Sequence, residues 1–194
     1  DLTERVAAGH EVRLTVGVSK ELTRETIPPG QVIDLPDGRR KQTYLHDFYN
    51  YGGLARSVRL YSTPQTHIRD VIVRTAVDAG TGRIAVATEV SGAADVELRL
   101  LDEDGSVVAT GSGAEATLEV PEVRLWQPGA AYLYSLEVAL HRDGEQVDAY
   151  ALPVGVRTVE VRGTEFLING EPFYFTGFGK HEDTPVRGKG HDDA

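Results

Sequence analysis

The stretch DVIVRTAVDAGTGRIAVATEV, residues 70–90, decides the fold class of this chain. Apolar and polar residues alternate in DVIVRTAV (70–77) and again in RIAVATEV (83–90), and valine, isoleucine and alanine fill the apolar positions. Alternation with a period of two places the apolar side chains on one face of a strand, and β-branched residues suit that pleated surface. The Thr81–Gly82 pair between the two runs predicts a turn. We therefore expect two antiparallel strands with one buried face.

The same alternation recurs along the chain, in HEVRLTVGV (10–18), DVELRLLD (95–102), YLYSLEVAL (132–140) and VRTVEVRG (156–163). Asp-Gly or Asn-Gly pairs stand at 37–38, 104–105, 143–144 and 169–170, and such pairs favour tight hairpins because both residues tolerate positive φ. No run has convincing helical periodicity. Between residues 63 and 161 the strands have the spacing of a seven-strand immunoglobulin-like β-sandwich. The sequence therefore predicts one complete all-β domain there.

Composition and charge limit the kinds of partner. The chain has 20 Lys and Arg against 30 Asp and Glu, which gives a net charge of -10. Such a surface repels phosphate backbones and anionic lipid, so we expect neither a nucleic acid nor a membrane partner. Cysteine is absent, which excludes disulfides and thiolate chemistry within these residues and fits a reducing compartment. A cytoplasmic location of the bacterial type is the corresponding expectation.

The two flanks of this domain are expected to be incomplete. Residues 1–62 offer two or three strands around a long irregular stretch, and long loops of this kind are usually functional or disordered. The tail predicts a hairpin followed by one strand, FYFTGFG (173–179), and then a charged cluster, Lys180, His181, Glu182 and Asp183. Charged residues at the end of a buried strand are typical of the active-site mouth of a (β/α)8 barrel. Methionine is absent even at position 1, and we interpret the chain as an excised or processed piece of a longer protein.

Three stretches carry a resemblance to a known family. They are IPPGQVIDLPDGRRKQTYLHDFYNYGGLARSVRLYSTP (27–64), RLWQPGAAYLYSLEV (124–138) and FLINGEPFYFTGFGKHED with the later RGKG (166–183 and 187–190). In register and in order, they resemble the β-glucuronidases of the family 2 glycoside hydrolases. The resemblance implies an immunoglobulin-like β-sandwich flanked by part of a jelly-roll β-sandwich and the first strand of a (β/α)8 barrel. The corresponding boundaries are residues 1–62 for the end of the sugar-binding jelly roll, 63–161 for the sandwich, and 162–194 for the entry hairpin and first barrel strand.

The resemblance also implies a reaction, the retaining hydrolysis of β-D-glucuronides by two glutamates. Both would lie downstream of this chain, so we expect no catalytic residue here and no activity of this piece alone. The family pattern assigns a substrate-binding role to Asp47, whose carboxylate would accept hydrogen bonds from sugar hydroxyls. The alternative is an Asp that caps its own loop. His46, Phe48, Tyr49 and Asn50 are expected to brace that loop.

The charged cluster has two interpretations. His181, Glu182 and Asp183 either support the site from behind its substrate-contacting residues or merely terminate the strand with local hydrogen bonds. Neither this HED triplet nor HDD (191–193) has defined metal-ligand spacing, so we expect no metal and no cofactor. Trp126 is interpreted as a packing residue, not a sugar platform.

Expected partners are a β-glucuronide substrate of the full-length enzyme and further copies of the same chain, because the parent enzymes are commonly homo-oligomers. Three alternatives stay open. The first is another family 2 glycosidase such as a β-galactosidase. The second is a stand-alone carbohydrate-binding module, which would need a complete jelly roll with exposed aromatic residues. The third is a structural immunoglobulin-like protein, which would leave FYFTGFGKHED unexplained.

Overall fold

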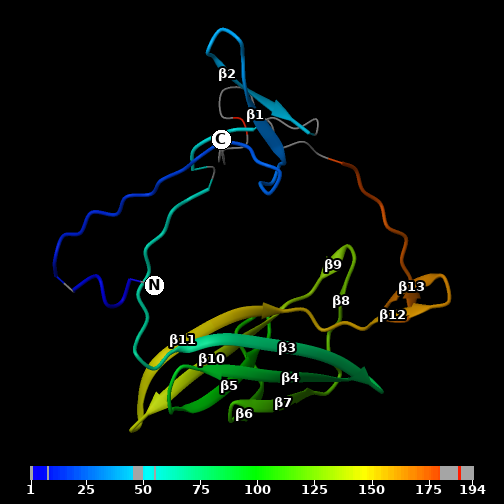
Figure 1. Cartoon of the computed structure of the whole chain (residues 1–194). Coiled ribbons are helices and arrows are strands. Elements are labelled where there is room, and N and C mark those ends of the chain that lie inside the picture. Colours follow the sequence, from blue (N-terminus) through cyan, green and yellow to red (C-terminus); the bar gives the residue numbers. More distant parts are fainter. Residues whose placement is uncertain (1, 8, 46–49, 55, 180–187, 189–194) are drawn as a thin grey trace. The chain divides into compact units, whose positions relative to one another are not determined.

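The computed structural model describes residues 2–7, 9–45, 50–54, 56–179 and 188 (Figure 1). The chain folds into two compact units. The larger unit is Tyr61–Gly177, and the smaller comprises Asp1–Leu60 with Phe178–Ala194. All regular secondary structure in the described residues is β-strand, which confirms the all-β class. Among these residues there is no helix long and apolar enough to cross a bilayer.

The larger unit contains a sandwich of two antiparallel sheets. One sheet has the order β3-β4-β7, formed by Ile68–Asp78, Thr81–Val90 and Glu115–Val120. The other has the order β11-β10-β5-β6, formed by Glu145–Val154, Tyr134–Arg142, Asp95–Leu101 and Val107–Ser112. The predicted seven-strand immunoglobulin-like sandwich is therefore confirmed. In constant-type immunoglobulin domains the fourth strand joins the sheet of the first two, whereas here β6 pairs with β5 in the other sheet.

The core lies between these two sheets and is built from the alternating positions of their central strands. On β5 the burial alternates strictly, and Leu98 and Leu100 are fully buried. Full burial of one such side chain stabilises a fold by about 1.5–3 kcal/mol. The other strands contribute in the same way, and the most buried core residues are Ile84, Val86, Leu98, Leu100, Leu118, Leu136, Val138, Leu140 and Val156.

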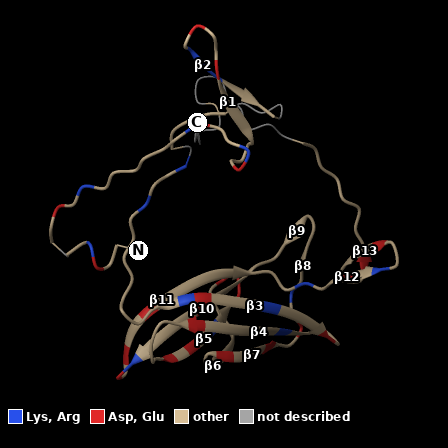
Figure 2. Cartoon of the chain, in the orientation of Figure 1, with Lys and Arg blue, Asp and Glu red and all other residues tan. Residues whose placement is uncertain are grey.

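The outward positions of the same strands carry charges of both signs, as the red and blue bands in Figure 2 show. Oppositely charged residues on neighbouring strands form ion pairs, such as Arg83 with Glu119 at 3.3 Å. Exposed pairs of this kind contribute at most about 1 kcal/mol each. They keep this face soluble while the inward face provides the stability.

The turns follow the predicted dipeptides with one correction. Asp143–Gly144 and Asn169–Gly170 each have positive φ at both positions, as expected for two-residue hairpins. At 37–38 and 104–105 only the glycine has positive φ, and the loops are longer. The prediction at Thr81–Gly82 was wrong, because both residues belong to β4 and the turn lies at Ala79–Gly80. There Ala79 takes a φ of 46°, a conformation that the sequence gives no reason to expect of alanine.

Two small sheets extend the sandwich unit. Strands β8 (Trp126–Gln127) and β9 (Ala130–Ala131) form a short hairpin. Strands β12 (Val159–Arg162), β13 (Glu165–Ile168) and β14 (Glu171–Pro172) form a separate three-stranded sheet. The hairpin predicted after residue 162 is therefore present, and it is not an edge strand of the sandwich.

Two predicted strands are absent from the described chain. Residues 10–18 are extended but belong to no sheet of the described chain. The same holds for residues 173–179. A strand is stable only when neighbours take up its backbone hydrogen bonds, and in the described chain only the first residue of each stretch donates one, Phe173 to Phe166 and His10 to Ala7. In the smaller unit the only sheet within the described residues is the hairpin of β1 (Gly30–Asp34) and β2 (Arg40–Tyr44).

Candidate functional site

The residues that the sequence predicts for the site lie outside the described part of the chain. Asp47 falls in the stretch 46–49, and His181, Glu182 and Asp183 fall in the stretch 180–187. His46, Phe48, Tyr49 and Lys180 lie outside it as well, and so does the triplet at 191–193. Their roles therefore stay predictions. The structure describes the residues that flank these stretches.

The stretch 46–49 is anchored at both ends. Before it, the Leu45 backbone N–H donates to the carbonyl oxygen of Pro29 at 3.2 Å, which continues the β1–β2 pairing beyond Tyr44. After it, the Asn50 side-chain amide donates to the carbonyl oxygen of Lys20 at 2.6 Å. Asn50 thus does what was expected of a bracing residue. The loop that carries Asp47 starts and ends at fixed points of the smaller unit.

The far end of the charged stretch 180–187 also has a fixed neighbour. A Cβ added to Gly188 would lie 2.6–2.9 Å from three ring atoms of Tyr51, and Gly188 has a φ of 57°. Only glycine combines this backbone conformation with so close an approach to an aromatic ring. Tyr51 comes two residues after the stretch 46–49, and Gly188 comes directly after the stretch 180–187. Sequence reasoning missed this contact, although the glycines of RGKG were a signal for a close approach of the backbone.

Aromatic residues gather where the chain leaves the three-stranded sheet. The Phe173 backbone N–H donates to the carbonyl oxygen of Phe166 at 2.8 Å, one residue beyond β14. The ring of Phe166 meets that of Phe175 edge to face at 4.8 Å between centroids, and Phe173 meets Phe175 at 5.1 Å. Such pairs contribute about 0.5–1.5 kcal/mol beyond their burial. They order the beginning of the stretch 173–179, which otherwise has no strand partner among the described residues.

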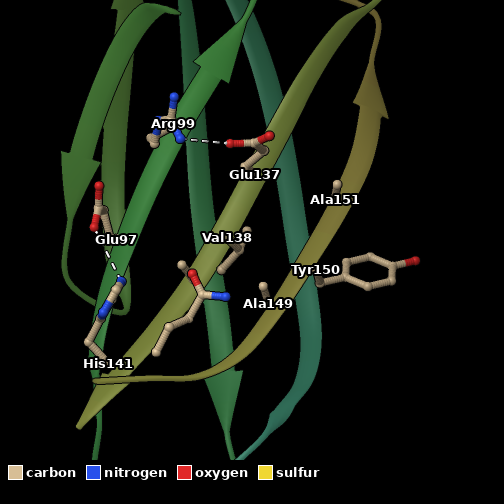
Figure 3. A pocket seen from close by; sticks show the side chains of 10 residues that line it. Glu97, Arg99, Glu137, Val138, His141, Ala149, Tyr150 and Ala151 are labelled. Carbon is tan, nitrogen blue, oxygen red and sulfur yellow. Dashed lines mark ion pairs between the residues drawn. The ribbon is translucent and has the colours of Figure 1, made fainter. Parts of the chain in front are cut away.

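A hollow of about 420 Å³ lies on the outer face of β11, β10 and β5 (Figure 3). Its charged residues pair with one another, His141 with Glu97 and Arg99 with Glu137, both at 3.3 Å. Tyr150 is at its rim, with its ring pointing away from these pairs. Each carboxylate contacts a basic side chain on an open sheet face, which is not the enclosed setting of a general acid. We interpret this hollow as a solvated surface.

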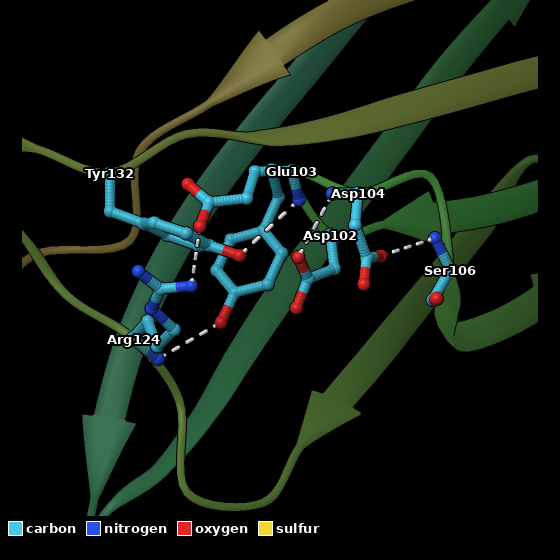
Figure 4. A network of polar contacts seen from close by, with 7 residues as sticks. Asp102, Glu103, Asp104, Ser106, Arg124 and Tyr132 are labelled. Carbon is cyan, nitrogen blue, oxygen red and sulfur yellow. Dashed lines mark hydrogen bonds and ion pairs between the residues drawn. The ribbon is translucent and has the colours of Figure 1, made fainter.

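A polar cluster at one end of the sandwich has shifted pKa values for structural reasons (Figure 4). The Arg124 guanidinium pairs with Glu103 at 2.9 Å, which raises the pKa of Arg124, and it stacks 3.8 Å from the Tyr132 ring centroid. Burial raises the pKa of Tyr132. The Tyr134 hydroxyl accepts the Arg124 backbone N–H at 2.9 Å, as in the tyrosine corner of immunoglobulin domains. These contacts fasten a loop to the core and leave no group poised for chemistry.

No cluster of three potential metal ligands occurs within the described residues. The triplets at 181–183 and 191–193 lie outside the described residues. The expectation that the chain has neither a metal nor a cofactor therefore stays untested.

Two family models match the chain. Residues 66–157 match glycosyl hydrolases family 2, and residues 159–194 match the TIM barrel domain of glycosyl hydrolases family 2. These matches meet close to the start of β12.

Curated relatives extend the similarity over the whole chain. A β-glucuronidase of Paenibacillus borealis is 47% identical over 201 residues, which cover 100% of this chain and 34% of that protein. The human β-glucuronidase is 44% identical over 211 residues, which cover 99% of this chain and 32% of that protein. The chain thus spans about a third of the length of these relatives.

Solved structures agree with the sequences. Lactobacillus rhamnosus β-glucuronidase superposes with a TM-score of 0.82 at 40% identity, over 89% of this chain and 29% of that one. Ruminococcus gnavus β-glucuronidase in complex with D-glucuronic acid superposes with a TM-score of 0.79 at 34% identity, over 89% and 30% of the two chains.

Proposed function

Because this chain belongs to family 2 of the glycosyl hydrolases, we propose that it is the non-catalytic scaffold portion of a retaining β-glucuronidase. The observation that carries the proposal is the extent of the similarity. Identity to proteins named β-glucuronidase runs through the smaller unit, the sandwich and the stretch that matches the barrel model. A structural or adhesive immunoglobulin-like protein would account for the sandwich and leave the match of residues 159–194 unexplained.

The proposed reaction needs two carboxyl groups about 5 Å apart, one to protonate the leaving oxygen and one to attack the anomeric carbon. We assign neither of them to this chain. The glutamates of the hollow, Glu97 and Glu137, contact His141 and Arg99 respectively on the outer sheet face. The role of this portion is to hold other parts of the enzyme in position, and we expect it to be inactive alone.

Asp47 is the residue of this chain that we propose to contact substrate, through charge-assisted hydrogen bonds to sugar hydroxyls. The anchored ends of its loop support this role, because a binding loop must present its side chain reproducibly. The contact between Tyr51 and Gly188 supports it further, because Tyr51 is four residues after Asp47 and Gly188 is five residues after Asp183. In this proposal His181, Glu182 and Asp183 orient the site without reacting.

The three-stranded sheet supports the placement of a barrel after the sandwich. Val159 and Val161 of β12 are 55% and 69% exposed, and Phe175, whose ring contacts that of Phe166 opposite Val161, is 64% exposed. Contiguous exposed apolar residues usually mark a surface that another element covers. A barrel that continues from residues 173–179 would cover these residues and supply the missing strand partners.

Two further properties belong to the same proposal. We propose that the parent enzyme is a homo-oligomer, as the resemblance implies, and that it is cytoplasmic, which the absence of cysteine supports. Analytical ultracentrifugation of the full-length enzyme at several concentrations tests the first, and a single monomeric species would contradict it.

The activity is tested by assaying the full-length gene product on a chromogenic β-glucuronide and the matching β-galactoside. We expect cleavage of the glucuronide with retention of anomeric configuration. Cleavage of the galactoside alone would replace the proposed substrate by that of another family 2 glycosidase. The 194-residue chain, assayed in parallel, should release no chromophore.

The role of Asp47 is tested in the same enzyme with Asp47→Ala and Asp47→Asn. Hydrogen bonds to a charged group contribute about 1.5–3 kcal/mol, so Asp47→Ala should lower kcat/KM roughly 10- to 150-fold. Asp47→Asn keeps an acceptor and should lose less. If kcat/KM of Asp47→Ala equals that of the unmodified enzyme, Asp47 has no part in the site.

A further inference from the structure

Asn169, in the turn between β13 and β14, makes three hydrogen bonds to residues of other segments. Its backbone N–H donates to the Thr158 carbonyl oxygen at 3.0 Å, and its side-chain oxygen accepts the Thr158 N–H at 3.0 Å. Its side-chain amide donates to the carbonyl oxygen of Trp126 at 2.9 Å, 43 residues away in sequence. The Asn169 side chain thereby ties the β13–β14 turn to two other segments, the residue that precedes β12 and the β8–β9 hairpin.

Trp126 is the second half of this arrangement, which we call the Asn169–Trp126 joint. Its backbone N–H donates to the Val156 carbonyl oxygen at 2.9 Å. Gly155 lies close to the Trp126 side chain, since an added Cβ there would be 3.0 Å from Trp126 Cβ, Cγ and Cδ1. The Arg157 guanidinium lies 4.8 Å from the ring centroid in a cation–π contact. Residues 155–158, which connect the sandwich to β12, are therefore held along their whole length.

The Asp143–Gly144 turn shows that the hairpin itself does not require these bonds. Asp143 and Asn169 have nearly equal φ, 55° and 53°, and each is followed by a glycine at 80–83°. The Asp143 side chain has no hydrogen-bond partner among the described residues, although its turn connects β10 to β11. The side-chain bonds of Asn169 therefore serve the connection between sheets and are not needed for the local turn.

We propose that Asn169 is a positioning residue: through the Asn169–Trp126 joint it fixes the direction in which the chain leaves the sandwich. Residues 173–179 follow this turn directly, and the match to the barrel model begins at residue 159. A rotation at residues 155–158 would displace everything that follows. The consequence for catalysis rests on the proposed function, whereas the joint itself does not.

Trp126 is the only tryptophan of the chain, so its fluorescence reports on the joint in the 194-residue protein. Asn169→Asp tolerates positive φ and keeps the acceptor for Thr158, but it turns an oxygen toward the Trp126 carbonyl. Asn169→Gly keeps the φ and removes both side-chain bonds. Both variants should shift the Trp126 emission to longer wavelength and lower its anisotropy, while the far-ultraviolet circular dichroism of the sandwich stays unchanged.

Asp143→Gly is the matched control, because it also replaces the first residue of a two-residue turn of nearly the same φ by glycine. It should leave the Trp126 emission unchanged. Unchanged emission in both Asn169 variants would overturn the joint, whatever the activity of the parent enzyme. An equal shift in Asp143→Gly would also overturn it, because the effect would then come from general loosening of the sandwich.

The consequence for catalysis is measured in the full-length enzyme, per active site titrated. A displacement of about 1 Å costs up to roughly 100-fold in rate, so Asn169→Gly should lower kcat roughly 10- to 100-fold with little change in KM. Asn169→Asp should fall between it and the unmodified enzyme. Asn169→Gly could shift the Trp126 emission of the 194-residue chain and still leave kcat of the full-length enzyme unchanged. That result would show that the joint does not affect catalysis, and it would overturn the positioning role. If the unmodified enzyme cleaves no glucuronide, the proposed function fails and the fluorescence result still decides the joint.

Discussion

Apolar and polar residues alternate in the same way in residues 10–18 and in residues 83–90, but only residues 83–90 form a strand of a sheet of the described chain. In β4, Ile84 and Val86 are 0% and 3% exposed and the strand has neighbours on both sides, β3 and β7. In the smaller unit, Val12 and Leu14 are 46% and 56% exposed, and no sheet of the described chain includes them. The pattern is the same, but only one of the two segments has partners within the described chain.

Alternation of apolar and polar residues therefore specifies which face of a segment is apolar, and it does not by itself produce a strand. A strand is stabilised when its apolar face is buried and its backbone groups are paired, and both depend on segments distant in sequence. The sandwich contains all the partners that its strands need. Residues 10–18 and 173–179 do not find theirs among the described residues, which agrees with the proposal that they belong to larger elements of the parent enzyme.

The largest expected effect comes from one leucine in each region. Leu136→Ala removes a fully buried side chain from β10 and should lower the free energy of unfolding by about 2.7–5 kcal/mol. Leu14→Ala, at a half-exposed position, should change it by less than about 0.5 kcal/mol. Urea denaturation followed by circular dichroism measures both. Equal losses in the two variants would mean that residues 10–18 share the core of the sandwich.

A smaller effect is expected from one glycine in each region. A Cβ at Gly111 would lie 2.7 Å from Leu118 Cδ2, and Leu118 is held in the core, so Gly111→Ala should cost about 1–3 kcal/mol through overpacking. Gly17 has no described atom within 4 Å of an added Cβ, and Gly17→Ala should be neutral. Thermal unfolding of the two variants distinguishes these outcomes. A clear destabilisation by Gly17→Ala would show that something packs against this segment.

The smallest effect is a pH dependence at two Asp-Gly turns. The Ser106 backbone N–H lowers the pKa of Asp104 in the β5–β6 loop, and the Arg39 side chain lowers the pKa of Asp37 in the β1–β2 loop. A carboxyl whose pKa is lower in the folded state stabilises that state above its ordinary pKa of about 3.9, and this contribution is lost as the pH falls through the lowered value. Asp104→Asn should therefore reduce the Tm of the sandwich slightly near pH 6 and not at the acid end.

Asp37→Asn is the matched variant in the smaller unit, and it should leave the Tm of the sandwich unchanged at every pH. Both variants are followed by thermal unfolding between about pH 2 and pH 6. A deficit of Asp104→Asn that grows toward acid pH would contradict the assigned direction of the pKa shift.

The sandwich could be predicted from the sequence because its determinants are local. Alternation and turn dipeptides fix which residues face inward and where hairpins form, and these signals were sufficient for the strands that contain Ile84, Leu98 and Leu136. The prediction at Thr81–Gly82 missed the turn by two residues because Ala79 adopts a conformation that favours glycine. The prediction of a strand at 173–179 was wrong for the same reason as that at residues 10–18, because no sheet of the described chain includes either segment.

The site could be predicted only through the resemblance. Nothing in the residue types around Asp47 distinguishes a sugar ligand from a loop cap, and Asp47 lies outside the described residues. The bond between Asn169 and Trp126 escaped prediction for another reason. The Asn169–Gly170 dipeptide signals a turn, but a contact across 43 residues depends on how the sheets pack.

The most direct test of the comparison is amide hydrogen exchange of the 194-residue chain, read by mass spectrometry. We predict that amides of residues 11–18 exchange as fast as those of an unstructured peptide, because none of them donates a backbone hydrogen bond to a described residue. Amides of residues 84–90 and 134–140 should be protected until the whole sandwich unfolds. Protection of residues 11–18 equal to that of residues 84–90 would contradict the claim that the sandwich is the part of this chain that is stable without partners.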